Sequence, residues 1–177
     1  QTAIGTVTAT DADGDTLTFS VSGSEIVIVS STGVLTFISA PDYETKSSYS
    51  VTVTASDGTN ATTQDISIFI NDINESPSIT SSASFTADEN QTSIGTVTVT
   101  DAEGDGVTFI ISGSEIAINS STGVLTFVSA PDYETKASYS ATVTVSDGNN
   151  SATQDITVAI NDVNEKPIIT SGSTYTV

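Results

Sequence analysis

The sequence predicts an all-β protein made of two tandem β-sandwiches. Apolar residues alternate with Ser or Thr at a period of two, which is the pattern of strands with one buried face. Turn-forming residues separate these short stretches, and no stretch shows a helical period. The whole arrangement recurs without insertion or deletion, so that Ile4-Gly5-Thr6 returns as Ile94-Gly95-Thr96. A repeat of this length matches a complete small domain and indicates tandem copies of one fold.

Strands are expected wherever the apolar residues keep this alternation. In the first copy the buried positions are Leu17, Phe19, Val21, Leu35, Phe37, Tyr49, Val51, Val53, Ala55, Ile66, Ile68 and Ile70. In the second copy they are Phe109, Ile111, Leu125, Phe127, Val143, Val145, Ile156, Val158 and Ile160. Gly, Asp and Ser predict turns between them at residues 13–15, 22–24, 31–33 and 56–58. About seven short strands per copy predict a sandwich.

The repeat predicts domains at residues 1–75 and 76–165, followed by a segment at residues 166–177. Residues 168–177 align with residues 78–87, so this segment has the sequence of an opening strand, which the first copy lacks. Two interpretations are open. The segment belongs to a longer array, or it completes the first copy of a neighbouring chain by strand addition, because an open sheet edge invites pairing.

The composition restricts the chemistry to oxygen ligands and favours cations as partners. There are 22 acidic and 3 basic residues, giving a net charge of -19, which repels nucleic acid and anionic membranes. The chain has no Cys and no His, which excludes thiolate or imidazole metal sites and the corresponding catalysis. No stretch is long enough to cross a bilayer. The composition indicates an extracellular protein, and Ca²⁺ is the expected cation.

Five acidic motifs follow one another along the chain, and most of them occur twice. They are Asp11-Ala12-Asp13, Asp42-Tyr43-Glu44, Ser56-Asp57-Gly58, the linker from Asp72 to Pro77, and Ala87-Asp88-Glu89-Asn90. In this order they resemble the motifs of cadherin repeats, specifically the bacterial cadherin-like type, over nearly the whole chain. The resemblance implies two tandem seven-stranded Greek-key, immunoglobulin-like sandwiches of cadherin type. It also implies calcium ions between successive domains.

The resemblance implies two sets of calcium ligands. At the central linker it implies the side chains or carbonyl groups of Asp42, Glu44, Ile73, Asn74, Glu75, Ser76, Asp101, Glu103 and Asp147. At the end of the second copy it implies Glu89, Asp132, Glu134, Val163, Asn164 and Glu165, which in a head-to-tail assembly would meet Asp11, Asp13 and Asp57 of a neighbouring molecule. Calcium suits such sets because it accepts about six to eight oxygen atoms in irregular geometry.

Other acidic residues are assigned differently. Glu25, Asp65, Glu115 and Asp155 have no counterpart in the family and are expected to be solvated surface residues, whereas Asp72 and Asp162 are left open between ligand and surface roles. The chain also departs from the family pattern. Glu103, Glu75 and Glu165 replace shorter Asp side chains, and Lys166 places a positive charge beside the last linker.

The predicted function is a calcium-dependent structural and adhesive module of an extracellular bacterial protein, with neighbouring repeats or identical subunits as partners. The alternative is a carbohydrate-binding accessory module of a secreted polysaccharide-degrading enzyme, with glycans stacking on Tyr43 or Tyr133. Scaffold positions are favoured for both tyrosines and for Tyr49 and Tyr139, because the chain has no Trp. An enzyme is disfavoured, because the same carboxylates recur at equivalent places in both copies, unlike a single active site.

Overall fold

The structure is a computed structural model that describes residues 1–174. It divides into two compact units, unit 1 from Gln1 to Ile73 and unit 2 from Asn74 onward. The predicted boundary after Glu75 lies slightly further along the chain, and the reason for the difference is that Asn74 is hydrogen-bonded to a loop of unit 2. The described residues form strands and no helix, which confirms the all-β prediction. They accordingly include no apolar helix of membrane-spanning length.

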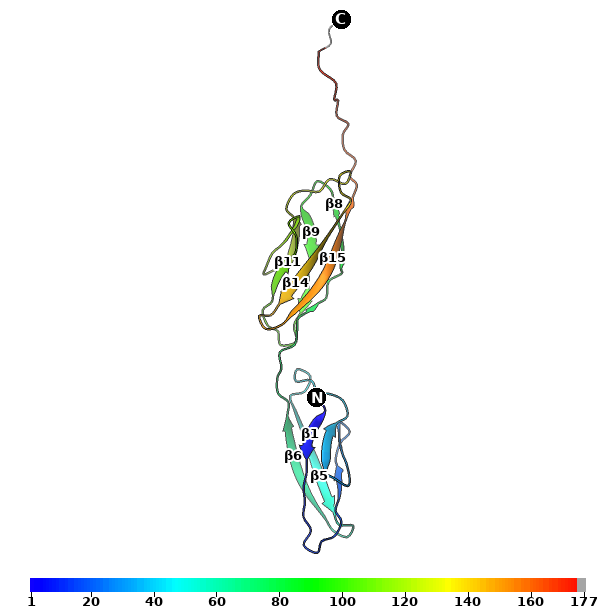
Figure 1. Ribbon diagram of the computed structural model, residues 1–177, viewed down its shortest axis with the longest axis vertical. Helices are drawn as coiled ribbons and strands as arrows, with labels where there is room; N and C mark the ends of the chain where they lie inside the picture. The colour runs from blue at the N-terminus through cyan, green and yellow to red at the C-terminus, as the bar shows by residue number, and fades with distance from the viewer. Residues whose placement is uncertain (175–177) are drawn as a thin grey trace. The chain divides into compact units, whose positions relative to one another are not determined.

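Unit 1 contains six strands in two sheets. One sheet has the order β1-β4-β3, formed by β1 (Ala3–Thr6), β4 (Val34–Phe37) and β3 (Ile26–Ile28). The other has the order β2-β5-β6, formed by β2 (Thr18–Val21), β5 (Ser48–Ser56) and β6 (Ala61–Phe69). All pairs are antiparallel, and the long β5 and β6 run side by side (Figure 1).

Unit 2 repeats this arrangement and adds strands at its beginning. A three-stranded sheet joins β12 (Ile116–Ile118), β13 (Val124–Phe127) and β9 (Ser93–Thr96). A four-stranded sheet has the order β11-β14-β15-β8, formed by β11 (Thr108–Ile111), β14 (Ser138–Ser146), β15 (Ser151–Asn161) and β8 (Ser84–Asp88). A small ribbon pairs β7 (Ser78–Ile79) with β10 (Val99–Thr100). The fold therefore is the predicted immunoglobulin-like sandwich.

The first strand of unit 2 switches from one sheet to the other. β7 pairs with β10, and a few residues later β8 lies parallel to β15 in the opposite sheet. Val97 lies between β9 and β10 and donates its N–H to the carbonyl of Gly123, so these two strands continue one another. Counting these interrupted strands once gives the seven strands of the predicted sandwich. The described residues of unit 1 contain no counterpart of β7 or β8.

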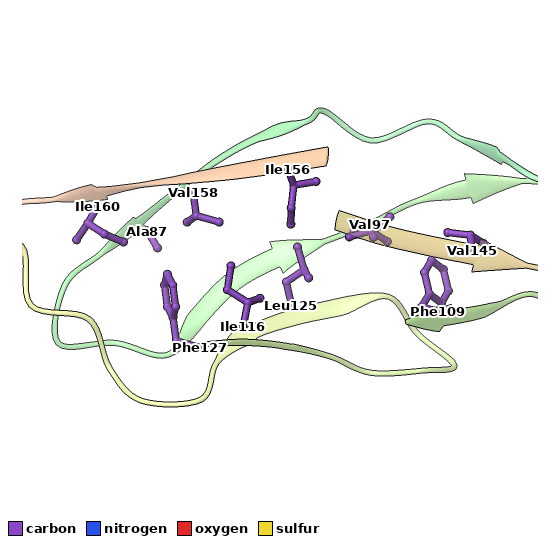
Figure 2. Packing of buried hydrophobic residues seen from close by; sticks show 11 residues of the cluster. Ala87, Val97, Phe109, Ile116, Leu125, Phe127, Val145, Ile156, Val158 and Ile160 are labelled. Atoms are coloured by element: carbon purple, nitrogen blue, oxygen red, sulfur yellow. The ribbon is translucent and has the colours of Figure 1, made fainter. Parts of the chain in front are cut away.

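The core of unit 2 lies between its two sheets and contains most of the residues that the alternation predicts, together with Ala87, Val97 and Ile116. Figure 2 shows Ile156, Val158 and Ile160 of β15 facing side chains that include Leu125 and Phe127 of β13. Ile156, Val158, Leu125, Val143 and Val145 are completely inaccessible to solvent. Each such side chain contributes about 1.5–3 kcal/mol when it is transferred from water to this interior.

The core of unit 1 has the same pattern but a less covered edge. Its buried cluster contains Ile26, Leu35, Phe37, Val51 and Val53. Ile66 and Ile68 of β6 are only partly buried, whereas their counterparts Ile156 and Val158 are fully buried. The difference arises because β8 covers this edge in unit 2, where Phe85 and Ala87 join the core.

Two of the three cationic residues have the same structural role in the two units. Lys46 forms an ion pair with Glu25 at 2.5 Å and lies 4.2 Å from the ring centre of Tyr49, which packs edge-on against Phe37. The equivalent contacts in unit 2 join Lys136, Glu115, Tyr139 and Phe127. Tyr49 and Tyr139 thus pack against the cores as predicted, and Glu25 and Glu115 are exposed as predicted.

The segment after the last strand of unit 2 is exposed. Residues 166–174 form no strand in the structure, and residues 175–177 lie outside the described residues. The assignment of residues 166–177 as the opening strand of a following repeat, or as a donor strand for another chain, stays a prediction.

Gly123 is the glycine of unit 2 whose replacement is predicted to be most damaging. Its φ is +69°, and an added Cβ would overlap the carbonyl oxygen of Val97 and lie 3.1 Å from the ring of Phe109. Gly113 has a similar φ of +84° but has open space around it. Gly113→Ala should therefore show only the left-handed backbone cost of about 1–2 kcal/mol. Gly123→Ala should lower the free energy of unfolding measurably more in urea denaturation, and equal losses would contradict this account.

Candidate metal centre

Glu89 is a buried carboxylate that connects three segments of unit 2. It follows β8 directly, and its side chain is only 2% exposed. Its Oε2 accepts the backbone N–H of Tyr133 at 2.9 Å, and its Oε1 accepts the backbone N–H of Val163 at 2.7 Å. The parallel pairing of β8 with β15 brings Glu89 beside the chain that leaves β15, because Asp88 is paired with Asn161. Burial of this charge requires such partners.

Asn90 fixes the turn that follows Glu89. Its φ is +63°, a left-handed conformation that Asn tolerates better than most residues. Its N–H donates to the carbonyl of Pro131 at 2.9 Å, and its side-chain amide donates to Oε1 of Glu165 at 3.0 Å. Asn90 therefore joins the loop before Tyr133 to the segment that leaves β15.

Four carboxylates gather around this point. Each of Glu89, Glu134, Asp162 and Glu165 offers one oxygen atom, and these atoms lie within 4.8 Å of one another. Glu134, Asp162 and Glu165 are exposed, so the group lies at the surface with Glu89 at its base. This carboxylate group is formed within unit 2 alone.

The electrostatics of the carboxylate group are unfavourable for a protein without a cation. The backbone N–H of Glu134 lowers the pKa of its side chain, but desolvation and the charges of the other three carboxylates outweigh this effect, so the pKa is raised. A divalent cation would change this repulsion into attraction. Carboxylate oxygens in irregular arrangement suit calcium better than magnesium, which requires octahedral geometry.

The predicted ligands of unit 2 are only partly present in this group. Glu89, Glu134 and Glu165 belong to it, whereas Asp132 does not. Asp132 instead caps a turn, accepting the N–H of Thr135 at 3.1 Å and its hydroxyl at 3.0 Å. Val163 contributes its N–H to Glu89, and the side chain of Asn164 donates to the carbonyl of Glu165 at 3.3 Å. Asp162, which the sequence left open, joins the group.

Asp42 of unit 1 has the same turn-capping role as Asp132. It accepts the N–H groups of Glu44 and Thr45 and the hydroxyl of Thr45. The hydrogen bond from this hydroxyl is the main cause that lowers the pKa of Asp42. Both residues thus stabilise the Asp-Tyr-Glu loop, and their predicted role as metal ligands stays a prediction. Tyr43 and Tyr133 in these loops are 38% and 37% exposed, so neither is a core residue.

A second set of predicted ligands lies at the start of unit 2, where Asn74 meets Asp147. Oδ2 of Asp147 accepts the side-chain amide of Asn74 at 2.9 Å, and this bond is the largest cause that lowers the pKa of Asp147. Asp101 accepts the N–H of Asp105 through Oδ1, while its Oδ2 is buried without a hydrogen-bond partner. An unpaired buried carboxylate oxygen is unusual and fits a cation ligand.

The remaining predicted ligands are loop residues whose roles as ligands stay predictions. In unit 1, Asp11 accepts the N–H groups of Asp13 and Asp15, and Asp57 accepts those of Thr59 and Asn60. The bond from Asn60 is the main cause that lowers the pKa of Asp57. Ile73, Glu75 and Ser76 are exposed, Glu44 lies in the loop that Asp42 caps, and Glu103 lies in the loop after Asp101.

The comparisons with known proteins identify the family. A family model described as bacterial Ig domain matches residues 1–69 and again residues 74–160. The chain belongs to the bacterial Ig domain family. The two matches of this family model correspond to the two copies of the repeat and to the sandwiches of units 1 and 2.

Curated relatives of this bacterial Ig domain chain include cadherins and a chitinase. It is 31% identical to human Cadherin-23 over 78% of this chain and 5% of that protein. It is 28% identical to mouse Cadherin EGF LAG seven-pass G-type receptor 2 over 93% of this chain and 6% of the receptor. It is 29% identical to Chitinase A of Pseudoalteromonas piscicida over 94% of this chain and 21% of the enzyme. The chain thus spans only a small part of each relative.

Solved cadherin structures have the same fold. Human Protocadherin-24 EC1-2 matches with a TM-score of 0.65 and 21% identity over 89% of this chain and 88% of that one. Drosophila N-cadherin EC1-4 matches with a TM-score of 0.65 and 18% identity over 90% of this chain and 44% of that one. These matches confirm the predicted cadherin-like fold of the bacterial Ig domains.

Replacing Glu134 by an uncharged residue should have opposite effects on the stability of the calcium-free protein and on its affinity for calcium. Because the pKa of Glu134 is raised, its charge destabilises the calcium-free protein at neutral pH, and this effect disappears as the pH falls below the raised pKa. Glu134→Gln should therefore raise the melting temperature in EDTA and weaken calcium binding. Asp15→Asn in unit 1 removes the same charge from a different loop and serves as the control. A lower melting temperature of Glu134→Gln in EDTA would contradict the repulsion.

Proposed function

We propose that this chain is a calcium-binding structural and adhesive module of a tandem array in an extracellular bacterial protein. The observation that supports this best is the group of Glu89, Glu134, Asp162 and Glu165, in which a buried carboxylate lies beneath three exposed ones. The chain has only three basic residues, and two of them, Lys46 and Lys136, are paired with Glu25 and Glu115 instead. A calcium ion would neutralise the group, using carboxylates that come from three segments of unit 2.

The position of the carboxylate group explains how an ion would stiffen the array. Glu89 ends β8, Glu134 lies in the loop that Asp132 caps, and Asp162 and Glu165 lie in the segment that leaves β15. An ion bound by all three would fix the direction of the outgoing chain, to which a following module would be attached. By repeat symmetry and family resemblance, Glu44, Asn74, Glu75 and Glu103 would contribute to a similar junction at the central linker.

Calcium binding by oxygen ligands also favours an extracellular location for the array. Extracellular calcium modules bind with dissociation constants of about 10⁻⁴ to 10⁻³ M, which match external rather than cytosolic calcium concentrations. Cadherin relatives and the secreted type of composition support an extracellular location. Neighbouring repeats or identical subunits would be the partners, and the module itself would be non-catalytic, because its carboxylates are organised as duplicated loop ligands.

Calcium should stabilise unit 2 and order the segment after β15. At about ten times the dissociation constant, each bound ion adds about 1.4 kcal/mol to the free energy of unfolding. We expect a higher melting temperature in millimolar calcium than in EDTA, slower hydrogen exchange at residues 162–165, and a change in small-angle scattering if the linkers stiffen. Magnesium should have a smaller effect. Identical melting curves and scattering with calcium and with EDTA would refute the mechanism.

A matched pair of variants tests the assignment of the site. Asp162→Asn removes a carboxylate from the group and should weaken calcium binding in titration calorimetry. Asp155→Asn makes the same change on β15, where the carboxylate is exposed and bonded to Thr142 instead. Only the first variant should change the affinity, and equal affinities for the two would exclude the group as the site.

A carbohydrate-binding role is the second candidate, and two observations favour it. The chain is similar to part of Chitinase A of Pseudoalteromonas piscicida, and Tyr43 and Tyr133 each leave more than a third of their surface exposed. Exposed aromatic rings are the usual stacking partners of sugars.

Chitin pull-down tests this second role. If Tyr43 and Tyr133 bind the polymer, the chain should sediment with insoluble chitin, and Tyr43→Ala together with Tyr133→Ala should abolish sedimentation. Replacing the packed Tyr49 by Phe keeps the ring inside the fold and serves as the control. Absence of wild-type binding to chitin and other insoluble polysaccharides would remove this candidate.

A further inference from the structure

Asn74 makes four hydrogen bonds in the segment that enters unit 2. Its side-chain amide donates to the carbonyl of Glu75 at 2.8 Å and to Oδ2 of Asp147 at 2.9 Å. Its Oδ1 accepts the side-chain amide of Asn149 at 3.2 Å, and its backbone carbonyl accepts that of Asn150 at 2.7 Å. The turn between β14 and β15 therefore binds both oxygen atoms of Asn74 through neutral amide groups.

The equivalent turn of unit 1 has the same backbone but different side-chain contacts. In both turns an Asp Oδ1 accepts two N–H groups at 2.6 Å, from Thr59 and Asn60 in unit 1 and from Asn149 and Asn150 in unit 2. In unit 1 the amide of Asn60 turns back to Asp57 at 3.5 Å, and Thr59 stands where unit 2 has Asn149. The two turns thus share their backbone hydrogen bonds but differ in sequence at Thr59 and Asn149.

The side-chain amide of Asn149 donates a hydrogen bond to Oδ1 of Asn74, an atom that could also bind a cation. An Asn side-chain oxygen is a calcium ligand, and an amide N–H group offers a partial positive charge to the same oxygen. Because this N–H group already donates to Oδ1 at 3.2 Å, a calcium ion that approaches Oδ1 would compete with it. Asn150 does not compete in this way, since it binds the backbone carbonyl.

We propose that Asn149 and Asn150 form a metal-independent clasp that holds Asn74 on unit 2, and that Asn149 competes with calcium for Oδ1 of Asn74. The second part rests on the proposed function, whereas the first does not. The clasp lets the entry segment stay ordered when calcium is low, whereas at the other end Glu134, Asp162 and Glu165 repel one another until a cation binds. The two ends of unit 2 would then respond to different calcium concentrations.

Three variants of the full chain test both parts. Asn149→Thr introduces the residue that unit 1 has at this place and removes the bond to Oδ1 of Asn74. Asn150→Ala removes the bond to the carbonyl of Asn74 but leaves the competitor in place. Thr59→Asn adds an amide to the turn of unit 1, where Asn60 already bonds Asp57, and serves as the control.

Two measurements separate the outcomes. The first is hydrogen exchange of residues 74–79 in EDTA, which should become about threefold to tenfold faster in Asn149→Thr and in Asn150→Ala, the effect of one hydrogen bond. The second is the calcium concentration at half-change of the Asn74 side-chain amide resonance. It should fall about threefold to tenfold in Asn149→Thr alone, because only this variant frees Oδ1.

Each result has a defined meaning. Unchanged exchange in EDTA for both variants of unit 2 would overturn the clasp. Faster exchange without a tighter calcium response in Asn149→Thr would overturn the competition and leave Asn149 with a purely structural role. If the wild-type protein bound no calcium at all, the proposed function would fail, but exchange in EDTA would still decide whether the clasp exists.

Discussion

Unbalanced negative charge is the constraint on which the rest of this structure depends. The chain has 22 acidic and 3 basic residues, and two of its Lys residues are already paired with Glu25 and Glu115. Apolar residues must therefore supply both cores, and carboxylates must find partners other than cationic side chains. The sandwich meets this condition by alternating apolar residues with Ser and Thr along the strands and by concentrating carboxylates in the turns, with Glu89 as the buried exception.

The carboxylates of the turns fall into two classes, those with lowered and those with raised pKa values. Asp42, Asp57 and Asp147 accept hydrogen bonds that lower their pKa values, so these charges are stabilised by the fold itself. Such residues help the protein at neutral pH and lose this contribution as the pH falls through their lowered pKa values. The group around Glu89 is different, because desolvation and the charges of the neighbouring carboxylates raise the pKa of Glu134. This contrast distinguishes carboxylates that stabilise loops from carboxylates that repel one another in the absence of a cation.

Alternation in the sequence was sufficient to predict the sandwich and most of its core, because period two depends only on local backbone geometry. It could not predict that β7 and β8 pair with different sheets, since this choice depends on distant strands. The same limit applies to the site. Asp132 and Asp162 both occur in repeated acidic motifs, but only the fold shows that the first caps a turn and the second joins Glu89.

Equivalent residues of the two described units have different surroundings. Ile66 and Ile156 occupy equivalent positions, but β8 lies beside only the second, so the same side chain is half-buried in one unit and fully buried in the other. The turns around Asp57 and Asp147 share their backbone bonds, but Thr59 in the first is replaced by Asn149 in the second. A single exchange of Thr for Asn at this turn adds a hydrogen bond to Oδ1 of Asn74. If Asn149 competes with calcium as proposed, tandem copies would acquire different calcium responses through their turns.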